Sequence, residues 1–182
     1  GFSNVSLVLM YGLPGQTQDM FLDSLSQCLA LQPTHLSCYG LKLEPMTEMG
    51  REAPVLPDDD AQADMYLYTV AFLKEHGYEQ YEISNFAKPG FESRHNLKYW
   101  QLQEYAGFGP GAHSDFGGVR YAYEKDVESY IAAAHGGQFQ FSENAAIPAR
   151  ERDAEWIMLG SRTVYGLDPK EYENRFRRYK ER

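Results

Sequence analysis

Cysteine is scarce in this chain of 182 residues, which contains only two, Cys28 and Cys38. They form no C-x-x-C pair, so neither a disulfide framework nor a self-contained metal site is indicated. Basic residues are also few, because 17 Lys and Arg stand against 26 Asp and Glu, for a formal net charge of −9. Phosphate binding needs clustered cations. We therefore expect no nucleic-acid partner.

Long apolar runs are missing as well. No stretch of the sequence approaches the roughly 20 apolar residues of a membrane span, and no basic-then-apolar leader opens the chain. We expect a cytoplasmic protein that is not itself a membrane protein. The chain starts at Gly1 rather than at Met, and a helical pattern runs to its last residue. This favours a piece of a longer protein.

Strands and helices alternate in the first 83 residues. The apolar run at residues 4–11 predicts a buried strand, and a helix with an apolar stripe follows Thr17. A second strand is predicted at 35–43, a second helix from the acids at 58–60 to Gly77, and a third strand at 78–84. This order indicates an α/β fold, in which parallel strand pairing is the default.

The composition and apolar pattern of the sequence change after Ser84. Residues 85–118 are rich in glycine and have little apolar periodicity, which predicts a long ordered loop, and such loops are often functional. Further on, the pattern predicts a strand at 119–123, helices at 126–134 and at about 147–163, and a last amphipathic helix.

The loop contains the run RHNLKYWQ, residues 94–101. His95, Asn96, Tyr99 and Trp100 would together offer a ligating nitrogen, an amide and two aromatic faces, which suits a planar ligand such as a porphyrin. A second interpretation remains open, in which the two aromatic residues fill the core while His95 and Asn96 fasten the loop.

The other histidines give weaker signals. His35 opens a strand and is expected to be structural, and His76 and His135 precede glycine at predicted helix ends, where an imidazole can bind the last carbonyls. The role of His113, in the glycine-rich stretch GFGPGAHS, stays open. The sequence shows no Ser-His-Asp or Cys-His order for covalent hydrolysis, so no catalytic residue is assigned.

Several motifs together carry a family resemblance: YGLPGQT, LKLEPMT, LPDDD, GYEQYEISNFAKPG, HNLKYW and GFGPGAHS, in this order. They resemble the HemW family of radical S-adenosylmethionine (SAM) heme chaperones, which are similar to the oxygen-independent coproporphyrinogen III oxidases. The resemblance runs from about residue 4 to the end of the chain. The H-N-x-x-Y-W run and the G-x-G-x-G-A-H-S loop are its most specific parts.

The resemblance implies a fold and a domain order. Residues 1–83 would be the last βα units of a partial TIM barrel, residues 84–146 a loop and strand region with the H-N-x-x-Y-W motif, and residues 147–182 the start of a helical C-terminal domain. The expected fold class is therefore α/β, the C-terminal part of a radical SAM barrel followed by a smaller mixed or helical region. The sheet edge left without its preceding strands could allow a dimer.

The resemblance also implies ligands. Family members bind SAM, a [4Fe–4S] cluster and heme, and are thought to hand heme to acceptor proteins. By position, His95, Asn96, Tyr99 and Trp100 fall on the heme motif, and Tyr39 and Gly40 on contacts to SAM. Val8 stands where the family has an aspartate that contacts SAM, and a hydrophobic side chain cannot accept those hydrogen bonds.

The C-x-x-x-C-x-x-C motif that binds the cluster is not in this sequence, so the resemblance implies no metal ligand in this chain and no reductive cleavage of SAM by it alone. Two functions stay open for the whole protein. The first is a heme chaperone, and the alternative is a coproporphyrinogen III oxidase that decarboxylates its substrate in porphyrin biosynthesis. A third possibility is a folded scaffold without a ligand.

Overall fold

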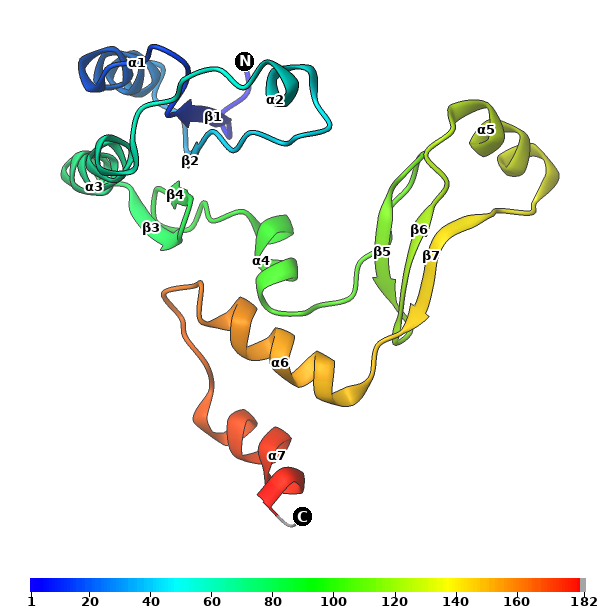
Figure 1. Cartoon of the computed structure of the whole chain (residues 1–182). Coiled ribbons are helices and arrows are strands. Elements are labelled where there is room, and N and C mark those ends of the chain that lie inside the picture. Colours follow the sequence, from blue (N-terminus) through cyan, green and yellow to red (C-terminus); the bar gives the residue numbers. More distant parts are fainter. Residues whose placement is uncertain (181–182) are drawn as a thin grey trace. The chain divides into compact units, whose positions relative to one another are not determined.

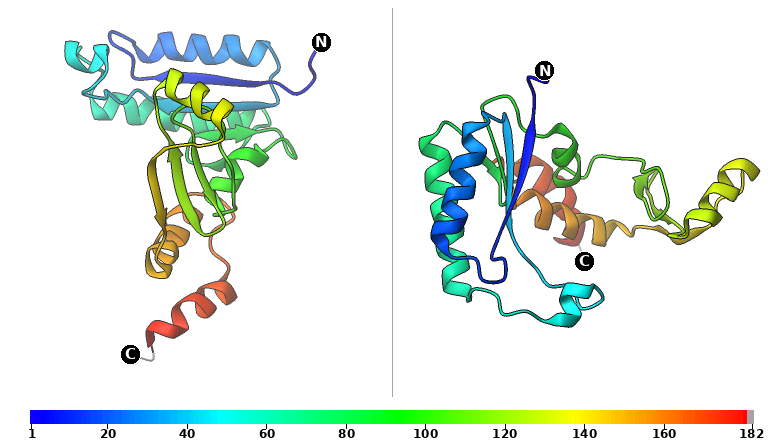
Figure 2. Two further views of the ribbon diagram at one scale, coloured as in Figure 1. Left: turned by 90° about the vertical axis from the view of Figure 1, so that its right-hand side faces the viewer. Right: turned by 90° about the horizontal axis from the view of Figure 1, so that it is seen from above.

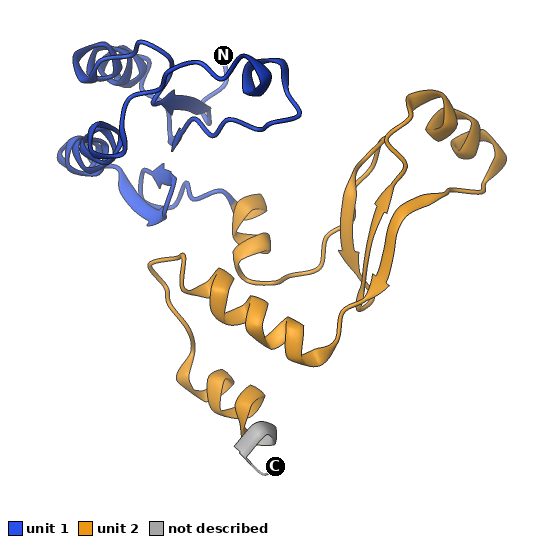
Figure 3. Cartoon of the chain, in the orientation of Figure 1, with its two compact units in different colours: residues 1–93 blue, residues 94–182 orange. Residues whose placement is uncertain are grey.

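A computed structural model describes residues 1–180, of which the last three lack described side chains. The chain divides into two units, residues 1–93 and residues 94–182 (Figure 3).

The first unit is built on a four-stranded sheet, ordered β1-β2-β4-β3 (Figure 1). Its strands are β1 (Ser6–Tyr11), β2 (His35–Gly40), β3 (Glu79–Glu82) and β4 (Asn85–Ala87). The predicted parallel pairing is confirmed for β1 and β2, where Val8 lies opposite Ser37. Between β2 and β3 the short strand β4 is inserted, antiparallel to both. The strand β1 has a neighbour on one side only.

Two helices cover one face of this sheet and lie side by side (Figure 2). They are α1 (Gln18–Ala30) and α3 (Asp59–Glu75), and a short helix, α2 (Glu48–Glu52), lies between β2 and α3. Thr17 and Asp58 cap α1 and α3, since their side chains accept hydrogen bonds from the backbone N–H groups of Met20 and Ala61. Gly77, with φ 81°, follows the end of α3.

The core of the first unit lies between these helices and the sheet. Apolar side chains from α1, α3 and every strand but β3 form one buried cluster, with Tyr78 from the segment before β3: Leu9, Phe21, Leu25, Leu36, Cys38, Met65, Leu73, Tyr78 and Phe86. Burial of this surface is the main source of the unit's stability.

The second unit begins with α4 (Arg94–Trp100) and continues into an antiparallel sheet ordered β5-β6-β7. Its strands are β5 (His113–Phe116), β6 (Val119–Tyr123) and β7 (Phe141–Ala146), with α5 (Val127–Gly136) between the last two. Two further helices follow, α6 (Ala149–Gly160) and α7 (Pro169–Lys180), and α6 packs against α4. The loop expected over residues 85–118 thus contains β4, α4 and β5.

Candidate functional site

The H-N-x-x-Y-W run forms the helix α4, and this sets which of its side chains meet. Residues four apart are neighbours on a helix surface. The His95 Nε2 atom lies 2.9 Å from the Tyr99 hydroxyl, and the two rings meet edge to face with centroids 5.1 Å apart. His95 is exposed and Tyr99 is half-buried. The helix therefore presents an imidazole with one nitrogen already held.

Trp100 is directed into the second unit. The Arg162 guanidinium lies over its indole ring, 4.9 Å from the ring centroid, in a cation–π contact. The indole Nε1 atom is buried and has no hydrogen-bond partner among the described residues. One face of Trp100 is thus covered by Arg162. Asn96 is half-buried on the same helix.

Tyr99 has a second neighbour beyond His95. The ring of Tyr105 meets it edge to face with centroids 4.7 Å apart. Both tyrosines line a cavity of about 80 Å³, together with Leu102, Gln103, Asp115, Arg120 and Leu159. This cavity holds no more than a few water molecules. A tetrapyrrole is too large for this cavity, whereas His95 itself is exposed.

His113 lies on β5 and is exposed. Its Nδ1 atom is 3.7 Å from a carboxylate oxygen of Glu143 on β7. A protonated His113 would therefore pair across the sheet, which is a structural use of this side chain.

Tyr39 and Gly40, predicted to contact SAM, close the strand β2 in the first unit. Tyr39 is 40% exposed, and a Cβ atom on Gly40 would approach the Tyr11 ring to 3.1 Å. Val8 is 62% exposed on β1. It is accessible but offers no hydrogen-bonding atom, so the residues at this end of the sheet fit SAM only in part.

Beside Val8 the same sheet carries a polar row that the sequence pattern did not reveal. Ser37 donates its hydroxyl to the Asn85 side-chain oxygen, and the Asn85 amide donates to Glu82. Glu82 is 2% exposed, and its Oε2 atom has no partner among the described residues. The motif Y-E-I-S-N contained two of these residues, but the strand β4 that aligns them with Ser37 could not be recognised from three residues.

His35 is a structural histidine, as predicted. It is 4% exposed, with Nδ1 2.7 Å from the Ser6 hydroxyl and Nε2 2.8 Å from the Tyr81 hydroxyl. Burial lowers the pKa of this imidazole. The prediction for His76 is confirmed too, because its Nδ1 atom is 2.7 Å from the Phe72 carbonyl in the last turn of α3.

The two cysteines do not suit an iron–sulfur cluster, which is bound by thiolates. Cys38 lies in the core, and burial raises the pKa of its thiol to about 12. Burial also raises the pKa of the Cys28 thiol. Within residues 1–180 no group of three His, Cys, Asp or Glu side chains is arranged to hold a metal ion. The described residues therefore do not fit a [4Fe–4S] cluster.

None of the described helices is both long enough and apolar enough to cross a membrane.

Known proteins match this chain over nearly its whole length. It is 38% identical to the heme chaperone HemW of Bacillus subtilis over 98% of the chain, and 37% identical to that of Lactococcus lactis over 97%. It is 47% identical to HemW of Escherichia coli over 62% of the chain. The match covers 48% and 47% of the first two proteins, so the chain spans about half the length of the curated relatives it matches.

A solved structure shows the same fold. The coproporphyrinogen III oxidase HemN of Escherichia coli, described as a radical SAM enzyme, superposes with a TM-score of 0.80 at 22% identity, over 98% of this chain and 46% of that one. This confirms the expected α/β fold class, because the chain has the fold of about half of the HemN protein. No family model matches the chain. The similarity to these two HemW proteins over nearly the whole chain shows that the chain belongs to the HemW family, whose C-terminal part it matches.

Proposed function

We propose that this chain is the heme-contacting part of a heme chaperone, which binds heme beside His95 and passes it to heme-requiring proteins. The observation that carries the proposal is the exposed His95 on α4, held at one ring nitrogen by Tyr99, in a chain whose relatives are named heme chaperones. Metal-binding histidines usually donate their second ring N–H to a nearby acceptor.

The chemistry of the pair follows from its hydrogen bond. When the Nε2–H group of His95 donates to the Tyr99 hydroxyl oxygen, the Nδ1 atom keeps its lone pair for a metal ion. Tyr99 then fixes both the tautomer and the orientation of the ring. Asn96 and Trp100 are proposed to complete the surface beside it, Trp100 through the ring edge that Arg162 leaves uncovered.

The longer protein is proposed to use a [4Fe–4S] cluster and SAM, with cluster ligands outside these residues. Tyr39 and Gly40 remain our proposed contacts to SAM. We further propose a cytoplasmic protein, since Cys28 and Cys38 are both free thiols. A dimer formed through the single-sided strand β1 is likewise a proposal.

The test is an anaerobic titration of ferric heme, followed by absorbance, into the longer protein that contains these residues. We expect His95→Ala to weaken heme binding by at least roughly tenfold, while the matched variant His135→Ala, which changes an exposed histidine at the end of α5, binds as the wild type does. Equal binding by His95→Ala and wild type would overturn the proposal. If the heme absorbance band were lost in His113→Ala instead, the heme-binding histidine would be His113 on β5.

The alternative function is that of a coproporphyrinogen III oxidase, and the likeness to HemN favours it. Anaerobic release of carbon dioxide from coproporphyrinogen III by the longer protein would support the oxidase. Saturable heme binding without decarboxylation would support the chaperone.

A further inference from the structure

We propose that Asp115 and Arg152, in an ion cluster on β5, β6 and α6, are positioning residues for His95. The inference rests on the proposed heme-binding function. Neither residue lies in the H-N-x-x-Y-W motif, and the connection to His95 runs through Tyr105 and Tyr99.

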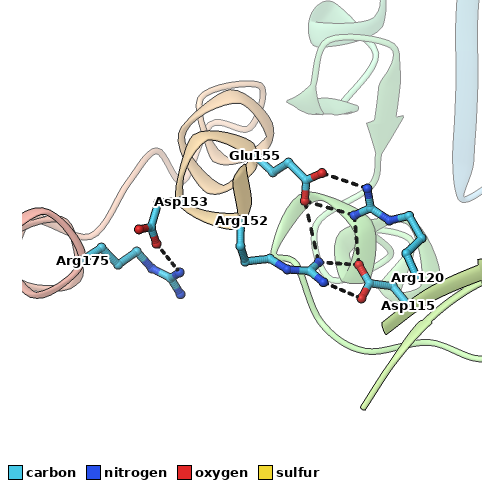
Figure 4. Close-up of polar contacts among 6 residues, drawn as sticks. All are labelled: Asp115, Arg120, Arg152, Asp153, Glu155 and Arg175. Atoms are coloured by element: carbon cyan, nitrogen blue, oxygen red, sulfur yellow. Dashed lines mark hydrogen bonds and ion pairs between the residues drawn. The ribbon is translucent and has the colours of Figure 1, made fainter. Parts of the chain in front are cut away.

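The cluster is centred on the Asp115 carboxylate. Arg152 donates to both of its oxygens, the Nη2 donor at 2.8 Å from Oδ1, and the Arg120 Nη2 atom donates to Oδ2 at 3.0 Å (Figure 4). Asp115 is 7% exposed. The hydrogen bonds from Arg152, followed by those from Arg120, hold the pKa of this carboxyl below its usual range. It stays an anion between two guanidinium groups.

Glu155 closes the cluster on the other side. Its two carboxylate oxygens accept hydrogen bonds from Arg120 at 2.8 and 3.0 Å. Arg152 and Glu155 stand three residues apart on one side of α6, while Arg120 lies on β6. Side-chain exposures between 10 and 27% place the cluster well inside the surface. Removing one member of such a buried set leaves an uncompensated charge, unlike the loss of an exposed ion pair.

From Asp115 a continuous set of contacts leads to His95. The Tyr105 N–H donates to the Asp115 carbonyl at 2.9 Å, and the Asp115 N–H donates to the Tyr105 carbonyl at 3.0 Å. Tyr105 in turn packs edge to face on Tyr99, whose hydroxyl meets the His95 Nε2 atom. The backbone of Asp115 thus holds the backbone of Tyr105, and the Tyr105 ring supports Tyr99.

A second route passes through α6. This helix packs against α4, and Arg162, two residues beyond its end, covers the ring of Trp100. Because the cluster fixes α6 to β5 and β6, it fixes two supports of α4 at once. The helix α4 is short, and few other buried contacts would hold it in place. The cluster would therefore help to stabilise a binding site on the outer surface of α4.

Asp115→Asn tests the inference in the longer protein, by heme titration and by the absorbance and electron paramagnetic resonance of the bound ferric heme. We expect the affinity to fall roughly 2- to 30-fold, the range of indirect couplings, and the spectra to broaden. In a His95→Ala background the same substitution should have a clearly smaller effect on both, because most of its effect on heme passes through His95. An equal effect in both backgrounds would overturn the positioning role.

Asp153→Asn is the matched control on the same helix. Asp153 is 2% exposed and pairs with Arg175 at 3.3 Å, on the side of α6 that faces away from Asp115 (Figure 4). We expect it to lower stability and leave heme affinity and spectra unchanged. If it changed them as Asp115→Asn does, the effect would be one of general destabilisation and the inference would fail.

Two further outcomes are distinguished by the same experiments. If Asp115→Asn does not fold, Arg152→Lys replaces it in the test. This variant keeps the positive charge but loses the bidentate hydrogen bonding to Asp115. Unchanged heme spectra in Arg152→Lys would contradict the inference. If wild type shows no His95-dependent heme band, the proposed function fails first, and the inference with it.

Discussion

The Tyr99 hydroxyl lies next to one ring nitrogen of His95, the residue that we propose as the contact to heme. Imidazole has two nitrogens, and the group bonded to one determines the protonation of the other. Tyr99 also packs against Tyr105, so its ring and its hydroxyl serve different neighbours. The two contributions can be separated by removing the hydroxyl alone.

We expect Tyr99→Phe to weaken heme binding by roughly tenfold, a typical cost of losing the partner of a metal-binding histidine. The ring stays in place against Tyr105, so folding should be little affected. Heme titration of the variant, with circular dichroism to verify the fold, measures both. Wild-type affinity in Tyr99→Phe would show that this hydrogen bond does not serve the heme.

The buried His35 predicts a dependence of stability on pH. Burial lowers the pKa of this imidazole in the folded state, whereas an unfolded histidine titrates near about 6.5. As the pH falls, His35 therefore binds a proton more readily in the unfolded chain than in the folded chain. The free energy of unfolding consequently decreases as the pH falls below about 6.5.

Urea unfolding at about pH 7.5 and about pH 5 measures this effect. We expect acidification to lower the free energy of unfolding more in wild type than in His35→Gln. The same loss in both would mean that other groups account for the acid sensitivity.

At the scale of elements, α3 offers a matched pair of leucines. Leu73 is fully buried against the sheet, while Leu67 is 62% exposed on the same helix. We expect Leu73→Ala to lower the free energy of unfolding by about 2–5 kcal/mol and Leu67→Ala by about 0.5 kcal/mol or less. Similar losses for both variants, measured in urea, would contradict the packing described for this helix.

The long periodic helices were predictable from sequence, and so were the short strands β3 and β6, whereas β4, β5 and β7 were not. The helices α1 and α3 have capping residues and apolar stripes, and both lie close to their predicted bounds. The three residues of β4 and the four of β5 lie in a glycine-rich stretch and show no clear alternation of apolar and polar side chains. The buried residues of α3 are Met65, Thr69 and Leu73, whereas Tyr68 is 37% exposed.

The motif helix α4 shows the same limit at the site itself. Its seven residues show little apolar periodicity and lie in the stretch 85–118, so the sequence favoured a loop. The candidate residues could still be chosen from the sequence, because one short run contains a histidine, an asparagine and two aromatic residues. That Tyr99 rather than Trp100 accompanies His95 follows from helical spacing, which a loop does not provide.

In the whole molecule, the two units contain different proposed ligand contacts. The first unit holds the proposed SAM contacts and no thiolate set for a cluster, and the second holds the proposed heme contacts. We therefore expect radical chemistry to need residues beyond these. We expect heme contact through α4 not to need them, because His95, Tyr99, the ion cluster and α6 all belong to the second unit.

An anaerobic titration of ferric heme into this 182-residue chain, in parallel with the longer protein, shows whether the heme site lies within these residues. We expect saturable binding of one heme by both, with His95→Ala weakening each to a similar degree. Binding by the longer protein alone, or binding by the chain that His95→Ala leaves unchanged, would contradict this expectation.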